Sequence, residues 1–320
     1  MKAMVLAAGL GTRMRPLTER VAKPVLPVLN RPLLHWTLDL LARHGVNEVM
    51  VNLHHLPQTI RSAVGNGKAF GLKIRYSHER EILGTAGGPR HVRRWLGQDP
   101  FLLVNGDVLC DLDLSRLVEW HVARGALATL ALRRNPDPRR YAAVRTNAQG
   151  RVVCLPGVRR RRAGRAWLFA GVQVVEPRLL ERLPEGPRDS IRDLYAPLVD
   201  ADEAILGLEM RGTWLDMGTP ELYRCGQLAA LARGFAGVGP QKALVDRRAK
   251  VSKGARVTRS VVGAHAVIER GAHVQGSVVL GGAHVGAGAH VRNAVLAWGA
   301  QVPPGDRVRG GVVTAAATPQ

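Results

Sequence analysis

A regular internal repeat in the C-terminal part of the chain limits its possible folds more than any other feature. Apolar residues recur in steps of five or six from Val251 to Val308, and three such steps complete one period. Two small residue types share this period: Gly254, Gly271, Gly288 and Gly305, together with Ala249, Ala266, Ala283 and Ala300. A repeat this regular indicates a solenoid, whose coils bury their apolar residues against the neighbouring coils.

Each period has room for three short strands, with Val and Ile facing inward and small residues at the corners. The pattern resembles the left-handed parallel β-helix of hexapeptide-repeat proteins. We therefore expect a β-helix over residues 236–320 and a separate domain over residues 1–235. Because a short solenoid exposes faces and coil ends, we expect the other domain or another subunit to cover them. We also expect a homo-oligomer formed through or near the β-helix.

The region before the repeat, 1–235, alternates between strand and helix patterns. Apolar or alternating runs predict strands at 4–8, 48–53, 72–76, 101–104, 127–132, 167–175 and 204–209, and a hairpin over 141–155. Helical spacing and capping residues predict helices between Pro32 and Gly45 and at 57–64, 89–96, 114–124, 177–183, 190–199 and 220–232. This alternation favours a mostly parallel, Rossmann-like α/β sheet. Ligands bind beyond the carboxyl ends of the strands in such sheets, so Gly9–Arg15, Gly84–Gly88 and Asp107 are expected to meet in one crevice.

The turn after the first strand has the features of a phosphate-binding loop. Gly9 and Gly11 allow a sharp turn and a close approach of the backbone to a ligand. The amide N–H groups of such a turn can cradle phosphate. Arg13 and Arg15 add fixed positive charge with several hydrogen-bond donors.

Two common phosphate motifs are absent from this loop. The dinucleotide fingerprint G-x-G-x-x-G fails at Met14, and the Walker string does not occur in the chain. The longer string from Leu6 to Thr18, LAAGLGTRMRPLT, is followed by Lys23-Pro24. It resembles the signature of the sugar-1-phosphate nucleotidyltransferases (NDP-sugar pyrophosphorylases). The resemblance implies transfer of a nucleoside monophosphate from a nucleoside triphosphate to a sugar 1-phosphate, with release of pyrophosphate.

Further segments and the solenoid extend the resemblance over nearly the whole chain. Leu83–Gly87 and the string FLLVNGDVLCD at 101–111 look like the mannose-1-phosphate guanylyltransferases that carry a β-helix tail. Val104–Asp107 and Phe169–Gly171 also look like muramic-acid-phosphate uridylyltransferases, which usually lack that tail. Mannose-1-phosphate guanylyltransferase is therefore the first expectation. Uridylyl or thymidylyl transfer to glucose or N-acetylmuramic acid 1-phosphate is the alternative.

This reaction needs positioning and charge neutralisation rather than a protein nucleophile. Mg²⁺ is the usual partner of phosphate oxygens and is held by one or two carboxylates. The resemblance implies that Asp107 and Asp216 are this magnesium pair, although each could by itself be a turn or helix-cap aspartate. It gives catalytic roles to Arg13 and Lys23, and Lys23 could otherwise be an ordinary surface lysine.

The resemblance also implies a set of binding residues. The nucleotide-binding set is Leu6, Ala8, Gly9, Gly11, Thr12, Arg13, Gly84, Thr85 and Gly87, and the sugar-phosphate-binding set is Asn105, Gly106 and Gly171. On spacing alone, the segment that contains Gly84 and Gly87 could equally be a flexible loop.

The chain departs from the family pattern at one place. Many members have Glu-Lys-Pro before the strand at 167, where this chain reads VCLPG at 153–157, and Phe169 stands where Asn is common. One of the arginines at 159–162 could replace the lysine, sugar binding could differ, or the chain could be a non-catalytic regulatory homologue.

Composition narrows the class of protein further. The net charge is +21, but few of the basic residues are lysines, and the arginines are spread along the chain. The one dense run, at 159–162, lacks the interleaved aromatic residues of a surface that binds single-stranded nucleic acid. We expect small anionic substrates and neither nucleic acid nor a membrane as partner, since no apolar run reaches the ~20 residues of a membrane helix. Cys110, Cys154 and Cys225 are far apart, which favours free thiols in the cytoplasm.

Histidines in the tail raise the possibility of a second, acyltransferase activity in the solenoid. The candidates are His265, His273, His284 and His290. His273 and His290 are separated by one full period, however, so they share one repeat position for a structural reason. Magnesium-dependent nucleotidyl transfer is the expectation that the residues favour.

Overall fold

A computed structural model describes residues 1–157, 163–235 and 242–315. By its internal contacts the chain divides into two compact units. We call the first the sheet unit; it contains Met1–Leu10, Leu34–Gly106 and Cys110–Trp214. The second, the solenoid unit, contains Gly11–Leu33, Asp107–Leu109 and Leu215–Gln320. The signature segment of the N-terminal region and the C-terminal repeat thus belong to the same unit.

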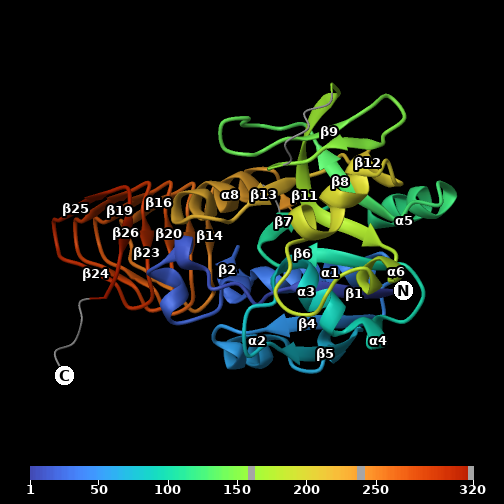
Figure 1. The fold of residues 1–320 in the computed structure, drawn as a ribbon. Coiled ribbons are helices and arrows are strands. Elements are labelled where there is room, and N and C mark those ends of the chain that lie inside the picture. Colours follow the sequence, from blue (N-terminus) through green and yellow to red (C-terminus); the bar gives the residue numbers. More distant parts are fainter. Residues whose placement is uncertain (158–162, 236–241, 316–320) are drawn as a thin grey trace. The chain divides into compact units, whose positions relative to one another are not determined.

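The sheet unit is built on a nine-stranded sheet (Figure 1). Its strands are β1 (Lys2–Leu6), β4 (Glu48–Leu53), β5 (Lys73–His78), β6 (Phe101–Asn105), β8 (Ala128–Arg133), β9 (Val144–Thr146), β10 (Val152–Cys154), β11 (Arg165–Val175) and β12 (Ile205–Glu209). The main path runs β10-β9-β11-β6-β1-β4-β5, and β8 pairs with β11 and β12. Strands β6, β1, β4 and β5 are parallel, whereas β11 is antiparallel to β6. The predicted Rossmann-like sheet is confirmed.

The helices of the sheet unit mostly lie where the apolar spacing predicts them. They are α2 (Pro57–Val64), α3 (Gly84–His91), α4 (Arg93–Leu96), α5 (Leu114–Ala123), α6 (Arg178–Glu181) and a π-helical segment (Ser190–Tyr195) that continues into α7 (Ala196–Asp200). Helix α1 (Leu33–Arg43) begins at the last residue of the Gly11–Leu33 segment. No helix among the described residues is long and apolar enough to cross a membrane.

Two predicted boundaries were wrong for reasons that lie in tertiary contacts. Strand β1 ends at Leu6 rather than at residue 8, because the amide of Ala7 donates to the side-chain Oδ1 of Asn52, 2.6 Å away. Helix α3 begins at Gly84 rather than at residue 89. The carbonyl of Arg188 accepts from the amides of Ala86 and Gly87, so Gly87 is held in helical conformation although glycine is a poor helix former.

The solenoid unit contains the predicted left-handed parallel β-helix. One face consists of β14 (Leu244–Val245), β17 (Val261–Val262), β20 (Val278–Val279), β23 (Val295–Leu296) and β26 (Val312–Val313), and a second of β15 (Lys250–Val251), β18 (Val267–Ile268), β21 (His284–Val285) and β24 (Gln301–Val302). The third face consists of β16 (Arg256–Thr258), β19 (His273–Gln275), β22 (His290–Arg292) and β25 (Arg307–Arg309). Each strand pairs in parallel with the strand one period later, as Val274 does with Val291, and the inward residues form one core.

Other segments of the solenoid unit contact this β-helix. They include helix α8 (Pro220–Ala232), whose N-terminus is capped by Thr219, and the short strands β2 (Pro27–Val28) and β3 (Arg31–Pro32). Arg224 of α8 donates through Nη1 to the carbonyl of Gly276 at 2.8 Å, and Asn30 donates through Nδ2 to the carbonyl of Val262 at 2.9 Å. The expected covering of the solenoid is thus supplied in part by this chain.

A buried histidine in the sheet unit makes the stability of the fold depend on pH. His121 of α5 is 1% exposed, with Nδ1 2.9 Å from Thr129 Oγ1 and Nε2 3.5 Å from Glu176 Oε1. Burial lowers the pKa of His121, and this effect outweighs the raising effect of Glu176. The unfolded chain therefore binds more protons, so stability is complete above the unfolded pKa of about 6.5 and is lost as the pH falls below it.

We therefore expect the melting temperature to fall between pH 7 and pH 5, and to fall less in His121→Gln, which cannot gain this charge. Calorimetric melting at several pH values in both proteins measures the difference. The same pH dependence in the two proteins would contradict the assignment.

Candidate functional site

Four of the predicted site residues lie together at the carboxyl ends of β1 and β6. Leu6 is opposite Asn105 in the parallel pairing, and the Gly106 amide donates to the Leu6 carbonyl at 2.9 Å. Gly171 of β11 lies beside them: its φ is +73°, and a Cβ there would be 2.8 Å from Asn105 Nδ2. Glycine at 171 therefore keeps the backbone of β11 close to the Asn105 side chain.

A buried polar network connects the end of β1 to the start of the glycine-rich segment. The Ala7 amide donates to Asn52 Oδ1, and Asn52 Nδ2 donates to Glu79 Oε1 at 2.8 Å. The other oxygen of Glu79 accepts from the Leu83 amide at 2.9 Å. Asn52 and Glu79 are each 3% exposed. Sequence reasoning missed both residues, and their only sequence signal is a polar residue at, or just after, the end of a predicted strand.

We expect Glu79→Gln to destabilise the protein by about 1–3 kcal/mol, because a glutamine donor would face either Asn52 or the Leu83 amide and leave a buried donor unsatisfied. Denaturant unfolding measures this change. Glu81→Gln at a neighbouring, less buried position is the matched control. Equal free energies of unfolding in the two variants would show that the network of Asn52 and Glu79 does not stabilise the fold.

The glycine-rich segment is the first turn of helix α3 rather than a flexible loop. A Cβ at Gly84 would lie 2.5 Å from the carbonyl of Arg188, and one at Gly87 would lie 2.5 Å from the carbonyl of Gly186. Thr85 contacts the same stretch, since its Oγ1 accepts from the Ser190 amide at 2.7 Å. The three predicted nucleotide-binding residues therefore lie in one turn, and their small size is explained by packing against residues 186–190.

The second half of the signature loop is in the solenoid unit. Gly11 has a φ of +64° and begins a short 3₁₀ turn over Thr12–Met14. Thr18 Oγ1 donates to the Gly11 carbonyl at 2.8 Å and a Cβ at Gly11 would be 2.9 Å from Thr18 Cγ2, so a side chain is excluded. Thr12 and Arg13 are exposed, and their polar groups are open to an anion. The first half of the loop belongs to the sheet unit, where Ala8 is buried and Gly9 is exposed.

Lys23 and Asp107 form an ion pair within the solenoid unit. Lys23 Nζ lies 2.7 Å from Asp107 Oδ2, and Lys23 is only 8% exposed, so it is no ordinary surface lysine. The Asp107 side chain is 36% exposed. One carboxylate oxygen of Asp107 is therefore held by a buried cation, and the carboxylate keeps access to solvent.

Asp216 and Asp107 lie at two neighbouring strands, Asp216 as the last residue of one and Asp107 just before the other. Asp107 immediately precedes β7 (Val108–Cys110), which pairs with β13 (Trp214–Asp216) in a two-stranded sheet. A Cβ at Gly218 would be 2.8 Å from Asp216 Oδ1, so glycine leaves room at this carboxylate. Carboxylates are the protein ligands that Mg²⁺ prefers, with its remaining ligands from water and phosphate, so Asp107 and Asp216 are the residues that could hold such a cation. Among the described residues no group of three or more His, Cys, Asp or Glu could hold a metal by itself.

Other predictions about the site are untested. The predicted crevice involves residues of both units and stays a prediction. The arginines at 159–162, which could replace the missing lysine, lie outside the described residues. The stretch 153–157 differs from the family pattern; in it, Cys154 ends β10 and Leu155 is buried. Phe169, the other residue that differs, packs against the core of the sheet unit. None of these three side chains offers a charged group to a phosphate.

Comparisons with known proteins identify the family of this chain. Residues 2–232 match the family "Nucleotidyl transferase", and residues 240–318 match the family "GMPPB C-terminal domain". A mannose-1-phosphate guanylyltransferase from Mycobacterium tuberculosis is 37% identical over 260 residues, which cover 80% of this chain and 71% of that protein. A UTP–glucose-1-phosphate uridylyltransferase from Synechocystis is 35% identical over 68% of this chain and 60% of that protein.

A further curated protein and a solved structure are also similar to this chain. An N-acetylmuramate alpha-1-phosphate uridylyltransferase from Neisseria meningitidis is 36% identical over 68% of this chain and 94% of that protein. The crystal structure of HddC from Yersinia pseudotuberculosis has a TM-score of 0.61 and 21% identity, and covers 71% of this chain and 97% of that one; the likeness shows the fold alone. The nucleotidyl transferase match covers more than half of the chain. The protein therefore belongs to the nucleotidyl transferase family.

Proposed function

We propose that the protein synthesises an NDP-sugar by transferring a nucleoside monophosphate from a nucleoside triphosphate to a sugar 1-phosphate. The observation that carries the proposal is the pairing of Lys23, from the signature region, with Asp107 at 2.7 Å. The pair of a buried lysine and a partly exposed carboxylate supports the proposal, because the lysine suits a phosphate and the carboxylate suits a divalent cation. The family match supports the same reaction class.

In the proposed reaction an oxygen of the sugar phosphate bonds to the α-phosphorus, while the bond to the bridging oxygen of the leaving pyrophosphate breaks. The exposed Arg13 guanidinium donates hydrogen bonds to the triphosphate and the leaving group, and Lys23 contacts a phosphate oxygen. The amides of Gly11 and Thr12 orient the phosphates. Asp107 and Asp216 would hold Mg²⁺, which when bound neutralises phosphate charge.

The remaining candidate residues orient the two substrates. The first turn of α3, with Gly84, Thr85 and Gly87, contributes backbone groups for the base, and Leu6, Ala8 and Gly9 line its end of the loop. Asn105, Gly106 and Gly171 are the proposed contacts of the sugar phosphate, which their closeness at the carboxyl end of β6 supports. Because glycines have no side chain, the substrates can approach the main chain closely at these positions.

We assign GTP and mannose 1-phosphate as the first substrate pair. The mycobacterial mannose-1-phosphate guanylyltransferase is 37% identical, and the tail matches the GMPPB C-terminal domain. The uridylyltransferase relatives at 35% and 36% identity support UTP with glucose or N-acetylmuramic acid 1-phosphate as the second candidate. The β-helix supports assembly of a homo-oligomer.

Pyrophosphate release tests the proposal. Each nucleoside triphosphate is crossed with mannose, glucose, N-acetylglucosamine and N-acetylmuramic acid 1-phosphates, with and without Mg²⁺. We expect release with one pair and only with the metal. Folded protein that releases no pyrophosphate with any pair would instead favour a non-catalytic regulatory homologue, and the missing lysine at 153–157 would account for it.

A further inference from the structure

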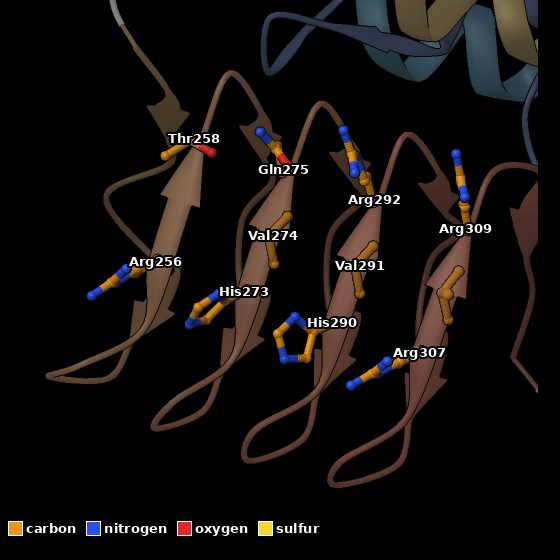
Figure 2. A pocket seen from close by; sticks show the side chains of 11 residues that line it. Arg256, Thr258, His273, Val274, Gln275, His290, Val291, Arg292, Arg307 and Arg309 are labelled. Carbon is orange, nitrogen blue, oxygen red and sulfur yellow. The ribbon is translucent and has the colours of Figure 1, made fainter.

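One face of the β-helix has a dense positive charge that the proposed reaction does not use. It is the sheet β16-β19-β22-β25, whose outward residues form two columns (Figure 2). We call these residues the basic ladder: Arg256, His273, His290 and Arg307 in one column, and Thr258, Gln275, Arg292 and Arg309 in the other. Together with inward valines they line a shallow groove of about 680 Å³.

The charged side chains of the basic ladder repel one another. Arg292 is directly opposite Arg309, so two guanidinium groups of like charge face each other across neighbouring strands. Such strands are about 4.8 Å apart, and like charges opposite each other destabilise a sheet. The rings of His273 and His290 have centroids 4.8 Å apart, which shows how closely the rows are stacked.

The described part of the chain supplies no counter-ion within this groove, since none of the residues that line it is a carboxylate. Asp306 is the acidic neighbour in sequence, and its carboxylate accepts from the backbone amide of Arg307. Elsewhere in the solenoid unit an arginine does have a carboxylate partner, as Arg248 does in Asp246 at 3.1 Å. Stable sheets avoid like charges on facing residues of neighbouring strands, and this face has them without a compensating carboxylate among the described residues. Such a departure indicates a functional surface.

The residue types that line the groove indicate which class of ligand it can bind. Its described lining includes no Phe, Tyr or Trp side chain on which nucleic-acid bases could stack. A second copy of this chain would bring a further charge of +21, so self-association through this face is opposed. The groove is open and lined by fixed guanidinium groups, which suit a compact ligand with several negative charges and phosphate oxygens.

We propose that the basic ladder binds a soluble polyphosphate anion, with Arg292, Arg307 and Arg309 as its principal contacts. These three arginines lie on two adjacent strands, so their guanidinium groups can engage neighbouring phosphates of one ligand. The site consists only of β-helix residues, and it is independent of the proposed nucleotidyl transfer.

Titration of the full chain with inorganic tripolyphosphate, in EDTA and moderate salt, tests this site by calorimetry. We expect the double variant Arg292→Gln and Arg309→Gln to bind at least tenfold more weakly than the wild type. Gln275 occupies the same column, so the fold accepts glutamine there. The control variant, Arg247→Gln with Arg270→Gln, removes the same charge from positions outside the groove and should bind as the wild type does.

A second readout is thermal stability. Without ligand, the Arg292 and Arg309 double variant should melt at or above the wild-type temperature, because repulsion is relieved, and tripolyphosphate should no longer raise its melting temperature. Arg13→Gln, which weakens the candidate nucleotide site, should keep the ladder-dependent binding.

Equal affinities in the ladder and control variants would overturn the proposal, and so would binding that depends on Arg13 alone. Tighter ladder-dependent binding of a poly-glutamate peptide, an oligo-dT strand or phosphatidylglycerol vesicles would also overturn it, by assigning the face to a macromolecule or a membrane.

Discussion

Asp107→Asn is expected to lower the rate of pyrophosphate release by about 100-fold or more, which is the size of effect seen when one preorganised electrostatic group is lost. Asparagine keeps the shape of the side chain but removes the negative charge that pairs with Lys23 at 2.7 Å and that would hold the metal. The secondary structure should be unchanged, because the Asp107 side chain is 36% exposed and asparagine creates no cavity. The buried Lys23 loses its charged partner, which should lower the stability without unfolding the chain.

The measurement is kcat and the Mg²⁺ dependence for Asp107→Asn, with circular dichroism as a check of folding. Asp113→Asn is a matched control, since Asp113 caps α5 through its side chain and asparagine caps equally well. A wild-type rate in Asp107→Asn would remove the metal assignment. Equal losses in both variants would show a general effect of removing carboxylates.

Gly84→Ala is expected to destabilise the sheet unit by about 3 kcal/mol, the sum of a conformational and a packing cost. The backbone at Gly84 has a φ of +76°, which costs an L-residue about 1–2 kcal/mol. The added methyl group would also lie 2.5 Å from the Arg188 carbonyl, and overpacking of this kind costs about 1–3 kcal/mol. The segment 186–190 must move, and the first turn of α3 moves with it.

A matched variant separates the two causes. Gly45 has a φ of +74° and nothing within 4 Å of its Cβ position, so Gly45→Ala should show the conformational cost alone. Denaturant unfolding of both variants gives the difference. If the turn binds the nucleotide base, Gly84→Ala should also raise KM for the nucleoside triphosphate more than KM for the sugar phosphate. Equal stability of the two variants would contradict the packing at residue 84.

The parts of the fold that depend on local sequence were predicted well. Helix α2 and strand β4 have the predicted limits, because their apolar periodicity is strong and their ends carry clear signals. Helix α8 begins at Pro220 after the Thr219 cap, as predicted. The regular C-terminal repeat predicted the β-helix with three short strands per period, since every coil repeats the same contacts.

The parts that depend on distant contacts could not be predicted. Helix α3 begins before its predicted start because the carbonyl of Arg188, far along the chain, binds its first amides. Asn52 and Glu79 are polar residues at strand ends, and only the folded structure shows that together they hold Ala7 and Leu83. Local patterns contain no information on such pairings.

The candidate site was predicted by resemblance more than by chemistry. Lys23 and Asp107 are 84 residues apart, and no rule of spacing joins them. Their ion pair is the structural finding that favours functional roles over a surface lysine and a turn aspartate. The assignment of base and sugar has less support, because backbone groups of Gly84, Gly87 and Gly106 give little sequence signal.

The central claim is nucleotidyl transfer at the α-phosphorus, and phosphorus NMR of a single reaction tests it most directly. Wild-type protein is mixed with GTP, mannose 1-phosphate and Mg²⁺, and the spectrum is followed over time. We predict that GDP-mannose and pyrophosphate form in equal amounts while both substrates decrease. A spectrum that shows orthophosphate and GDP, or unchanged substrates here and with every other pair, would contradict the proposed reaction.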